Sequence, residues 1–395
     1  MKKGWEYRSF KDVFPIKMGK TPPRGDSSSW DKTKVTSNRW VSIADISINE
    51  GKIIDDTKEY ITDKAAEKIN LVKAGSLLMS FKLSIGRMAF AGVDLYTNEA
   101  IIAIPKNEDY DLKFLYYYLL QYDWRTLTEG NEKVKGATLN KQSIGKIKLP
   151  VISSAEQRRI VSYLDSSFDL IDKIKENALK SLSEAKALFQ SALAEAMEPK
   201  EGWEENTLGE IGSFKRGGNF TKRDFIEDGF PCVHYGQIHM KFGHVTKQHL
   251  SCVPENFVKK DRCAKKGDLI IAITSEDDEG SCKCTAWMAN YEVYVGGHTA
   301  IYTHNLDPIF MSYYFQSPRF QKAKLEYTHG FKVVEINPKD IAKITIIYPP
   351  LPTQKQIVSR LDSLSSKVRA IEEKYQKMIA ECDALKQAMM REVFE

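Results

Sequence analysis

The sequence contains no long hydrophobic run, and this absence excludes one class of protein at the outset. A membrane-spanning helix needs about 18 or more consecutive apolar residues, and no stretch of the chain approaches that length. The opening MKKGWEYRSF is basic but lacks the apolar segment that follows in a signal peptide. We therefore expect no membrane association and a cytoplasmic location, where the six cysteines would be free thiols.

Metal-binding motifs are also missing. Five of the six cysteines and all seven histidines lie between residues 232 and 329, without a C-x-x-C or an H-x-x-x-H pair. The tightest pair is Cys282 and Cys284, whereas paired zinc ligands usually stand about two to four residues apart. Buried thiols and scattered histidines explain the cluster better, so we expect no metal.

Catalytic motifs are absent as well. The chain has no N-P-P-Y motif, no glycine-rich cofactor loop and no P-loop. A nuclease or methyltransferase that acts alone would need an Asn-Pro motif of this kind or a catalytic carboxylate–lysine set. The sequence therefore disfavours such an enzyme, and we expect no catalytic residue.

The bulk composition is that of a folded, multidomain protein. The chain has 395 residues, of which 42% are hydrophobic and 11% aromatic, and this length predicts two or more domains. The net charge of +5 is compatible with a polyanionic partner. It is weak evidence alone, because many proteins are equally basic.

The most informative feature of the chain is a tandem repeat. GWEYRSFKDVFPIKMGK at residues 4–20 matches GWEENTLGEIGSFKRGG at 202–218, and IVSYLDSSF at 160–168 matches IVSRLDSL at 357–364. The offset between the copies varies by only a few residues, as expected for duplicated domains with variable loops. The predicted parts are 1–150 and 200–350, two similar globular domains, and 151–199 and 351–395, two helical segments.

Each globular part is predicted to be mixed α/β. Short runs such as LLMSF, IIAIP, LIIAITS and KITIIYP are rich in branched or large apolar residues and are bounded by glycine or proline, which is typical of strands. The run DLKFLYYYLLQYDWRTL has apolar residues at helical spacing and predicts a helix. The expected fold class is therefore α+β.

Polar, basic stretches separate these elements and differ between the copies more than the framework does. They combine Lys and Arg with Ser, Thr and Asn, the residues that meet phosphates and base edges. Solvated loops have much the same composition, so that alternative stays open. The predicted DNA-contacting residues are Lys17, Lys20, Thr21, Arg24, Ser80, Lys82 and Arg87 in the first copy, and Lys215, Arg216, Asn219, Lys222, Arg223, Thr274 and Lys283 in the second.

The two helical segments carry apolar residues in alternating steps of four and three, the period of a coiled-coil interface. The first segment has smaller residues between its large ones, which suits pairing of two unlike helices within one chain. An antiparallel pair would make the repeat a pseudo-twofold object. The predicted helix-pairing residues are Ile160, Leu164, Ile171, Ile174, Leu188, Ile357, Leu361, Leu364, Val368, Ile371 and Leu385.

Two similar domains joined by two long helices would be held at a fixed distance from each other, and DNA is the ligand that best suits such an arrangement. Dimeric DNA-binding proteins read half-sites at a fixed spacing. Because the loops of the two copies differ, the two half-sites should differ too. The architecture predicts a bipartite, asymmetric DNA target with a spacer that the helices fix.

The whole chain resembles the specificity subunit of a type I restriction–modification system. The motifs that carry the resemblance are MGKTP at 18–22, NEAIIAIP at 98–105, and AEQRRIVSYLD echoed by PLPTQKQIVSRLD. The second copy departs from the first where RGGNFTKR replaces GKTPPR, which leaves the contacts of that loop open.

The resemblance implies a non-catalytic subunit that binds double-stranded DNA through two target recognition domains. It also implies helices that dock two modification subunits, which methylate adenine, and further restriction subunits. S-adenosylmethionine, ATP and magnesium would then be needed by the partners and no cofactor by this chain. The alternative is a coiled-coil scaffold that binds only proteins, which predicts no salt-sensitive affinity for DNA.

Overall fold

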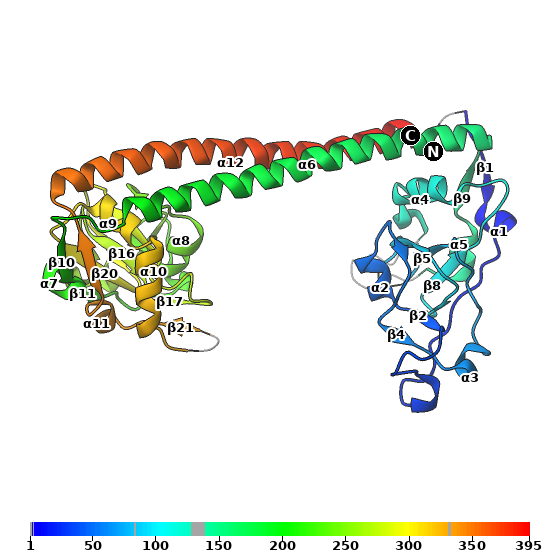
Figure 1. Ribbon diagram of the computed structural model, residues 1–395, viewed down its shortest axis with the longest axis horizontal. Coiled ribbons are helices and arrows are strands. Elements are labelled where there is room, and N and C mark those ends of the chain that lie inside the picture. The colour runs from blue at the N-terminus through cyan, green and yellow to red at the C-terminus, as the bar shows by residue number, and fades with distance from the viewer. Residues whose placement is uncertain (1, 3, 83, 128–138, 331–332) are drawn as a thin grey trace. The chain divides into compact units, whose positions relative to one another are not determined.

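The computed structural model describes residues 2, 4–82, 84–127, 139–330 and 333–395 (Figure 1). The chain divides into two compact units. Unit 1 comprises Met1–Asn177 and Met378–Glu395, and unit 2 comprises Ala178–Lys377. Two long helices, α6 (Ser154–Ala196) and α12 (Leu351–Phe394), contribute to both units. Each unit therefore combines one globular part with the beginning of one long helix and the end of the other.

Among the described residues, unit 1 has a four-stranded sheet of order β3-β6-β5-β8, a three-stranded sheet of order β4-β2-β7 and the pair β1-β9. Its strands are β1 (Glu6–Ser9), β2 (Arg39–Val41), β3 (Ile53–Ile54), β4 (Glu59–Tyr60), β5 (Leu77–Ser80), β6 (Met88–Ala91), β7 (Tyr96–Thr97), β8 (Ile101–Ile104) and β9 (Lys148–Val151). Its other helices are α1 (Phe10–Val13), α2 (Ile43–Ile48), α3 (Asp63–Ala66), α4 (Leu112–Leu120) and α5 (Lys141–Gly145), with 3-10 turns at Ser27–Ser29 and Trp124–Leu127.

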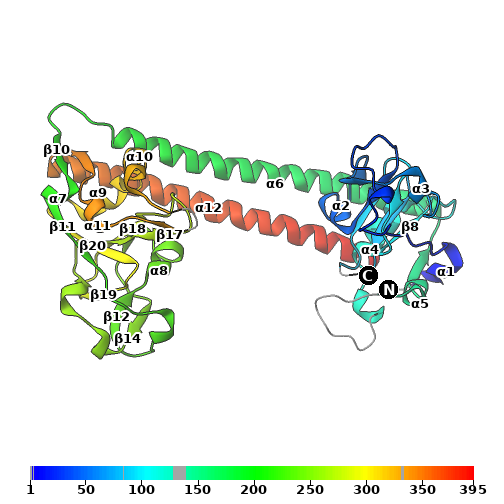
Figure 2. The same ribbon diagram turned by 90° about the horizontal axis from the view of Figure 1, so that it is seen from below.

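Unit 2, over its described residues, has a five-stranded sheet of order β11-β20-β16-β18-β13, a four-stranded sheet of order β14-β12-β19-β15, and the pairs β10-β22 and β17-β21. Its strands are β10 (Glu204–Thr207), β11 (Gly212–Arg216), β12 (Phe230–Val233), β13 (Val245–Thr246), β14 (Ser251–Val253), β15 (Cys263–Ala264), β16 (Leu269–Ala272), β17 (Thr274–Ser275), β18 (Cys284–Trp287), β19 (Val293–Val295), β20 (Thr299–His304), β21 (Val334–Glu335) and β22 (Thr345–Tyr348). Figure 2 shows β12, β14 and β19 grouped apart from β11, β18 and β20 within this unit.

The remaining helices of unit 2 are α7 (Leu208–Ile211), α8 (Tyr235–Met240), α9 (Pro308–Tyr314), α10 (Pro318–Lys324) and α11 (Pro338–Ile341). Its 3-10 turns are Lys222–Asp224, Glu255–Phe257, Lys260–Arg262 and Leu325–Tyr327. Asp307 begins α9 as Asp111 begins α4, since each carboxylate accepts hydrogen bonds from the first backbone N–H groups of its helix. Each globular part is thus built from short strands and short helices, and the corresponding helices α4 and α9 share the same cap.

The two units follow one plan. In unit 1 β5 pairs antiparallel with β6 and β8, and in unit 2 β16 pairs antiparallel with β18 and β20. β2 and β7 run parallel, as do β12 and β19. β1 pairs with β9 and β10 with β22, so each globular part begins and ends on adjacent strands. The predicted fold class, two similar mixed α/β domains with two long helices, is confirmed.

A glutamine near the start of each long helix fastens that helix to its globular part. The Gln157 Oε1 accepts a hydrogen bond from the Asp111 backbone N–H at 2.8 Å, and the Gln354 Oε1 accepts one from Asp307 at 2.9 Å. Both glutamines are buried. A buried amide needs partners, so these bonds fix the angle at which each helix leaves its domain.

The repeated IVSxLDS motif supplies a second attachment. The Tyr117 hydroxyl donates to the Asp165 carboxylate at 2.5 Å, and the Tyr313 hydroxyl donates to Asp362 at 2.7 Å. The leucine before each aspartate is fully buried against the same globular part. The motif therefore holds each helix to its own domain as well as contributing to the helix pair.

The two long helices pair antiparallel within each unit. As the numbering of α6 rises, that of its partner residues on α12 falls. Interhelical ion pairs include Asp172–Lys386 (2.6 Å) and Lys175–Asp383 (2.7 Å) in unit 1, and Lys186–Glu372 (3.8 Å) and Glu195–Arg360 (3.4 Å) in unit 2. The end of each helix also packs on a core: Phe394 of α12 on unit 1 and Met197, just after α6, on unit 2.

The predicted helix-pairing residues fall into two groups. Seven are buried or half-buried: Ile160, Leu164, Ile171, Ile357, Leu361, Leu364 and Val368. The prediction is wrong for the other four, which are exposed: Ile174 (41%), Leu188 (60%), Ile371 (38%) and Leu385 (51%). All four belong to one of the two tracks of the predicted interface, whose first residues, Ile160, Ile357 and Leu364, are buried or half-buried.

Charged side chains explain why these four residues are exposed. Lys175, Glu372 and Lys386 each follow one of the exposed residues, and their side chains are only 31%, 29% and 25% exposed. Their aliphatic stems cover the partner helix while the charged ends pair across the interface. The apolar pattern selected Ile and Leu at these places, but long charged side chains occupy the interface instead.

Candidate nucleic-acid interface

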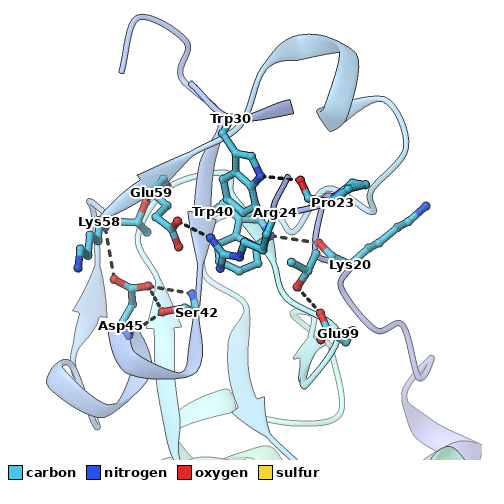
Figure 3. A network of polar contacts seen from close by, with 12 residues as sticks. Lys20, Pro23, Arg24, Trp30, Trp40, Ser42, Asp45, Lys58, Glu59 and Glu99 are labelled. Atoms are coloured by element: carbon cyan, nitrogen blue, oxygen red, sulfur yellow. Dashed lines mark hydrogen bonds and ion pairs between the residues drawn. The ribbon is translucent and has the colours of Figure 1, made fainter. Parts of the chain in front are cut away.

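In unit 1 the loop between β1 and β2 is anchored by two tryptophans (Figure 3). The Trp40 Nε1 donates to the Lys20 carbonyl and the Trp30 Nε1 donates to the Pro23 carbonyl, each at 3.1 Å. The two rings meet edge to face, with centroids 5.0 Å apart. Because Trp40 is buried, these contacts fix the loop on the domain surface.

Arg24 lies against both tryptophan rings. Its guanidinium carbon is 4.2 Å from the Trp30 ring centroid and 4.9 Å from that of Trp40. Its Nη1 donates to the Glu59 Oε1 at 2.5 Å. We call Arg24, Trp30, Trp40 and Glu59 the Arg24 clamp. The clamp orients the Arg24 side chain and leaves it 55% exposed.

Strand β4 presents Glu59 to the clamp, and a capping box supports that strand. Ser42 and Asp45 exchange hydrogen bonds at the start of α2. The Asp45 carboxylate also accepts a hydrogen bond from the Lys58 backbone N–H, one residue before Glu59. Figure 3 shows this network beside the clamp.

The other predicted residues of this loop are accessible. Lys17 and Lys20 are exposed, and Thr21 is half-buried. The Thr21 hydroxyl donates to the Glu99 carboxylate and holds the pKa of Glu99 below its usual value. Neither lysine has an ion-pair partner in the ranges that the structure describes.

A second group of predicted residues flanks β5 and β6. Ser80 has no exposed surface, and its hydroxyl donates to the Ser84 carbonyl. The prediction that Ser80 contacts DNA is therefore wrong, because the side chain points into the turn. Lys82 is half-buried beside the Phe81 ring. Arg87 is paired with Glu50 at 2.8 Å and remains 43% exposed.

In unit 2 the predicted basic residues lie on and after the edge strand β11. Lys215 and Arg216 are exposed, and Arg216 pairs with Glu335 at 2.8 Å. The other predicted residues of this segment, Asn219, Lys222 and Arg223, are also exposed.

An aromatic cluster around His234 lies beneath that segment. The rings of Phe220 and Phe225 stand 6.2 and 6.0 Å from His234. Burial lowers the pKa of His234 to about 4, so the ring is neutral near pH 7. Its Nδ1 accepts from the Gly236 backbone N–H and caps α8. This cluster corresponds in position to the Arg24 clamp of unit 1, since Phe220 and Phe225 precede α8 as Arg24 and Trp30 precede α2.

Thr274 and Lys283, also predicted, line a groove of about 1080 Å³ in unit 2. The Lys283 Nζ donates to the His239 carbonyl at 2.8 Å, and the Thr274 hydroxyl lies 3.2 Å from the His298 Nδ1. The acidic segment 275–280 borders the same groove. Buried Lys324 donates to the Ser281 carbonyl and fixes the end of that segment.

Sequence reasoning missed several residues that shape these surfaces: Trp30, Trp40, Glu59, Tyr235, His239 and His298. Trp30 and Trp40 had a signal, because each tryptophan follows a polar, loop-forming run. No local pattern connects Glu59 to Arg24, since they stand far apart in the sequence. Their pairing depends on the tertiary structure.

The histidine- and cysteine-rich part of the sequence forms no metal site in the residues that the structure describes, where no three His, Cys, Asp or Glu side chains are placed to hold an ion. All six cysteines are buried and unbridged. Burial raises the pKa of Cys232 to about 12 and that of Cys263 to about 11. Across the described helices none is long and apolar enough to cross a membrane.

Comparison with known proteins gives concordant matches. The family model "Type I restriction modification DNA specificity domain" matches residues 2–184 and 200–380. The specificity subunit of the type I restriction enzyme MjaVIII of Methanocaldococcus jannaschii is 23% identical over 337 residues, which cover 78% of each chain. That of MjaIX from the same organism is 24% identical over 245 residues, so the match spans 56% of this chain and about half (55%) of that relative.

A solved structure supports the fold. A chain from a study of complex assembly and conformational transition of the type I R-M system superposes with a TM-score of 0.75 at 19% identity, covering 100% of this chain and 98% of the other. The predicted role as a non-catalytic, DNA-recognising specificity subunit agrees with the family match and with the named relatives. The chain belongs to the type I restriction–modification DNA specificity family and carries two copies of its specificity domain.

Proposed function

We propose that unit 1 and unit 2 each read one half of a bipartite, asymmetric DNA site. The observation that supports this most strongly is a shared framework with unlike surfaces. The Gln157 and Gln354 contacts repeat, whereas the Arg24 clamp of unit 1 gives way to the His234 cluster in unit 2. Unlike surfaces on one framework suit two different half-sites.

The proposed contacts are the predicted residues without the buried Ser80. They are Lys17, Lys20, Thr21, Arg24, Lys82 and Arg87 in unit 1, and Lys215, Arg216, Asn219, Lys222, Arg223, Thr274 and Lys283 in unit 2. Long basic side chains suit phosphate contacts, which fix the position of a protein on DNA, while base contacts select the sequence.

The test is methylome sequencing of cells that carry this chain with its modification subunits. We expect one methylated motif with two unlike halves and a fixed spacer. A motif with a single half, or identical halves, would contradict the proposal. The alternative, a scaffold that binds only proteins, predicts that purified complexes bind DNA without the steep fall in affinity with salt that phosphate contacts cause.

We further propose that α6 and α12 set the spacer between the half-sites. Inserting one heptad at matching places in both helices preserves the interface register and adds about 10 Å of helix. The methylated motif should then gain about three base pairs of spacer, given roughly 3.4 Å per base pair. An unchanged spacer would rule out this role.

The finer proposal on partners is that the helices dock two modification subunits at equivalent surfaces. The offset that aligns Ile160 with Ile357 also aligns Ile174 with Ile371, and Leu188 with Leu385. Ile174, Leu188, Ile371 and Leu385 are exposed, and each is identical to its counterpart in the other copy. Exposed apolar residues retained in both copies favour a partner that binds each copy in the same way.

The docking proposal is tested by pull-down. Ile174→Glu should weaken capture of one modification subunit, Ile371→Glu that of the other, and the double variant should retain neither. The matched control is Leu179→Glu: Leu179 is also exposed on α6 (50%), but its counterpart in the second copy is the polar Gln376. Equal losses in the control and the variants would contradict the assignment.

The family match supports a proposal on the remaining partners. We propose that restriction subunits join the same complex, and that S-adenosylmethionine, ATP and magnesium serve the modification and restriction subunits rather than this chain. The cytoplasm, where the DNA substrate is found, is the proposed location. Omitting S-adenosylmethionine should abolish methylation by the complex while leaving the thermal stability of this chain unchanged.

A further inference from the structure

The Arg24 side chain is exposed and yet firmly held. Two indole rings and a carboxylate contact its guanidinium, and the indole N–H groups fasten the loop just before it, at Lys20 and Pro23 (Figure 3). A free arginine loses rotamer entropy when it binds a ligand. Here much of that loss has already occurred on folding, so Arg24 is preorganised for contact with a partner.

The charge around Arg24 argues against a phosphate as that partner. Glu59 lies 2.5 Å from the guanidinium and offsets its positive charge. A phosphate oxygen brought to Arg24 would also approach the Glu59 carboxylate and be repelled. A neutral group with hydrogen-bond acceptors meets no such repulsion.

Lys20, in the same loop, differs from Arg24 in its surroundings. Figure 3 shows its side chain extending away from the Arg24 clamp, and it is exposed. It carries an uncompensated charge on a flexible stem, as a phosphate contact requires. Of these two neighbouring cations, Arg24 is neutralised and oriented and Lys20 is not.

The donors that remain on Arg24 suit one base edge in particular. Its Nη1 bonds Glu59, and no acceptor lies within hydrogen-bond distance of its Nε or Nη2 among the residues that the structure describes. A guanidinium that presents two N–H groups side by side matches the O6 and N7 acceptors of guanine in the major groove. Lysine would present one point charge and could not match both acceptors in this way.

We propose that Arg24 is a specificity-determining residue that reads the guanine of one G·C pair, and that Trp30, Trp40 and Glu59 are its positioning residues. This inference rests on the proposed function, because it requires unit 1 to contact DNA. It adds the class of base that unit 1 selects and the side chain that selects it.

The experiment maps methylated motifs in cells that carry the full chain with its modification subunits. We compare the wild-type chain with Arg24→Lys, which keeps the charge but loses the paired donors. We expect preference for guanine at one position of one half-site to fall about ten- to a hundredfold, with the other half-site unchanged. Trp30→Leu, which releases one face of the guanidinium, should relax the same position less strongly.

Arg159→Lys is the matched control. Arg159 is also exposed (76%) and paired with a carboxylate, Glu156, but it lies on α6 and contacts no tryptophan. The motif should not change in this variant. Melting temperatures of Arg24→Lys and Arg159→Lys should match the wild type, which excludes loss of fold as the cause.

Two results would overturn the inference while leaving the proposed function intact. One is a uniform loss of methylation in Arg24→Lys with no relaxed position, which would make Arg24 a phosphate contact or a structural residue. The other is relaxation at a base pair that is not G·C. A wild-type chain that directs methylation without any sequence preference would instead contradict the proposed function itself.

Discussion

The two units show how one framework can carry two different recognition surfaces. Tyr117 and Tyr313 bond the aspartates of the repeated motif in the same way, and each unit uses a buried glutamine at the start of its long helix. The segments before α2 in unit 1 and before α8 in unit 2 differ. Unit 1 places Arg24 against two tryptophans there, and unit 2 buries His234 among phenylalanines.

This difference indicates which contacts a duplicated domain retains. The retained contacts join the globular part to its helix, where a change would disturb the packing of the whole unit. The contacts that differ lie in surface loops, which tolerate substitution. Variants of the framework residues can therefore test whether the two units are equivalent. Variants of the loop residues and of the histidines can test how the units differ.

The largest expected effect comes from the leucines of the repeated motif. Leu164 and Leu361 are both fully buried, each in the core of its own unit. Leu164→Ala and Leu361→Ala should each lower the free energy of unfolding of their unit by about 2–5 kcal/mol. Unit-resolved hydrogen exchange measures both losses. Ile371→Ala, at an exposed position, is the control and should change stability by less than about 0.5 kcal/mol.

If the two leucine variants differed by several kcal/mol, the units would not share one framework. A loss in the wrong unit would be equally informative, because each leucine packs in the core of the unit that contains it. Equal losses would support the comparison on which the proposed function depends.

The next effect distinguishes the units by pH. All seven histidines lie between residues 232 and 329, in unit 2. Burial lowers the pKa of His234 and of His304 to about 4, whereas an unfolded histidine has a pKa near 6.5. As the pH falls from about 6.5 to 4, the unfolded chain binds protons that the folded unit does not. Unit 2 should therefore lose on the order of 2 kcal/mol per histidine.

Unit-resolved hydrogen exchange between pH 7 and pH 4.5 tests this expectation. Unit 1 should lose less stability over that range. His234→Asn and His304→Asn provide the controls, because an asparagine oxygen can replace the accepting Nδ1 without titrating. The variants should flatten the pH dependence of unit 2; an unchanged slope would show that other groups cause it.

The framework was predictable from the sequence because its motifs occur there twice. The repeated glycine, tryptophan and IVSxLDS positions indicated two domains and two helices, and one track of the helix interface, with Leu361 and Val368, followed from the apolar period. The second track did not. A hydrophobic pattern cannot anticipate that Lys175 and Lys386 bury their stems and pair across the helices.

The candidate site was only partly predictable, for a different physical reason. Composition identified the loop that holds Arg24, but it gives no side-chain direction, so Ser80 was assigned to the surface although it is buried. The partners that distinguish Arg24 from Lys20 come from β2 and β4. Such contacts arise from strand pairing, which local sequence patterns do not specify.

A smaller effect is expected from the tyrosines that bond the motif aspartates. Tyr117→Phe and Tyr313→Phe each remove one hydrogen bond to a carboxylate, which should lower the free energy of unfolding by about 1–2 kcal/mol. Asp165 is 30% exposed and Asp362 46% exposed, so water can partly replace the lost donor. Urea denaturation of the single variants, and of each with the matching Asp→Asn change, measures the coupling. Absence of coupling in one unit only would break the equivalence.

The smallest effect concerns the cations that we assign to phosphate contacts, Lys17 and Lys20 in unit 1 and Lys222 and Arg223 in unit 2. Replacing either pair by alanine should weaken DNA binding by the assembled complex roughly fivefold, about 1 kcal/mol. It should also lower the slope of log affinity against log salt by about 1.8, because two phosphate contacts are lost.

The loss should be the same for every DNA sequence, in contrast to Arg24→Lys. The matched control removes two exposed lysines of unit 1 outside the loop between β1 and β2, Lys64 and Lys68, and should leave the salt slope unchanged. If the control lowered the slope equally, net charge rather than these loops would bind DNA. If the Lys17 and Lys20 variant relaxed a base preference instead, the division of this loop into phosphate-contacting lysines and a base-reading arginine would fail.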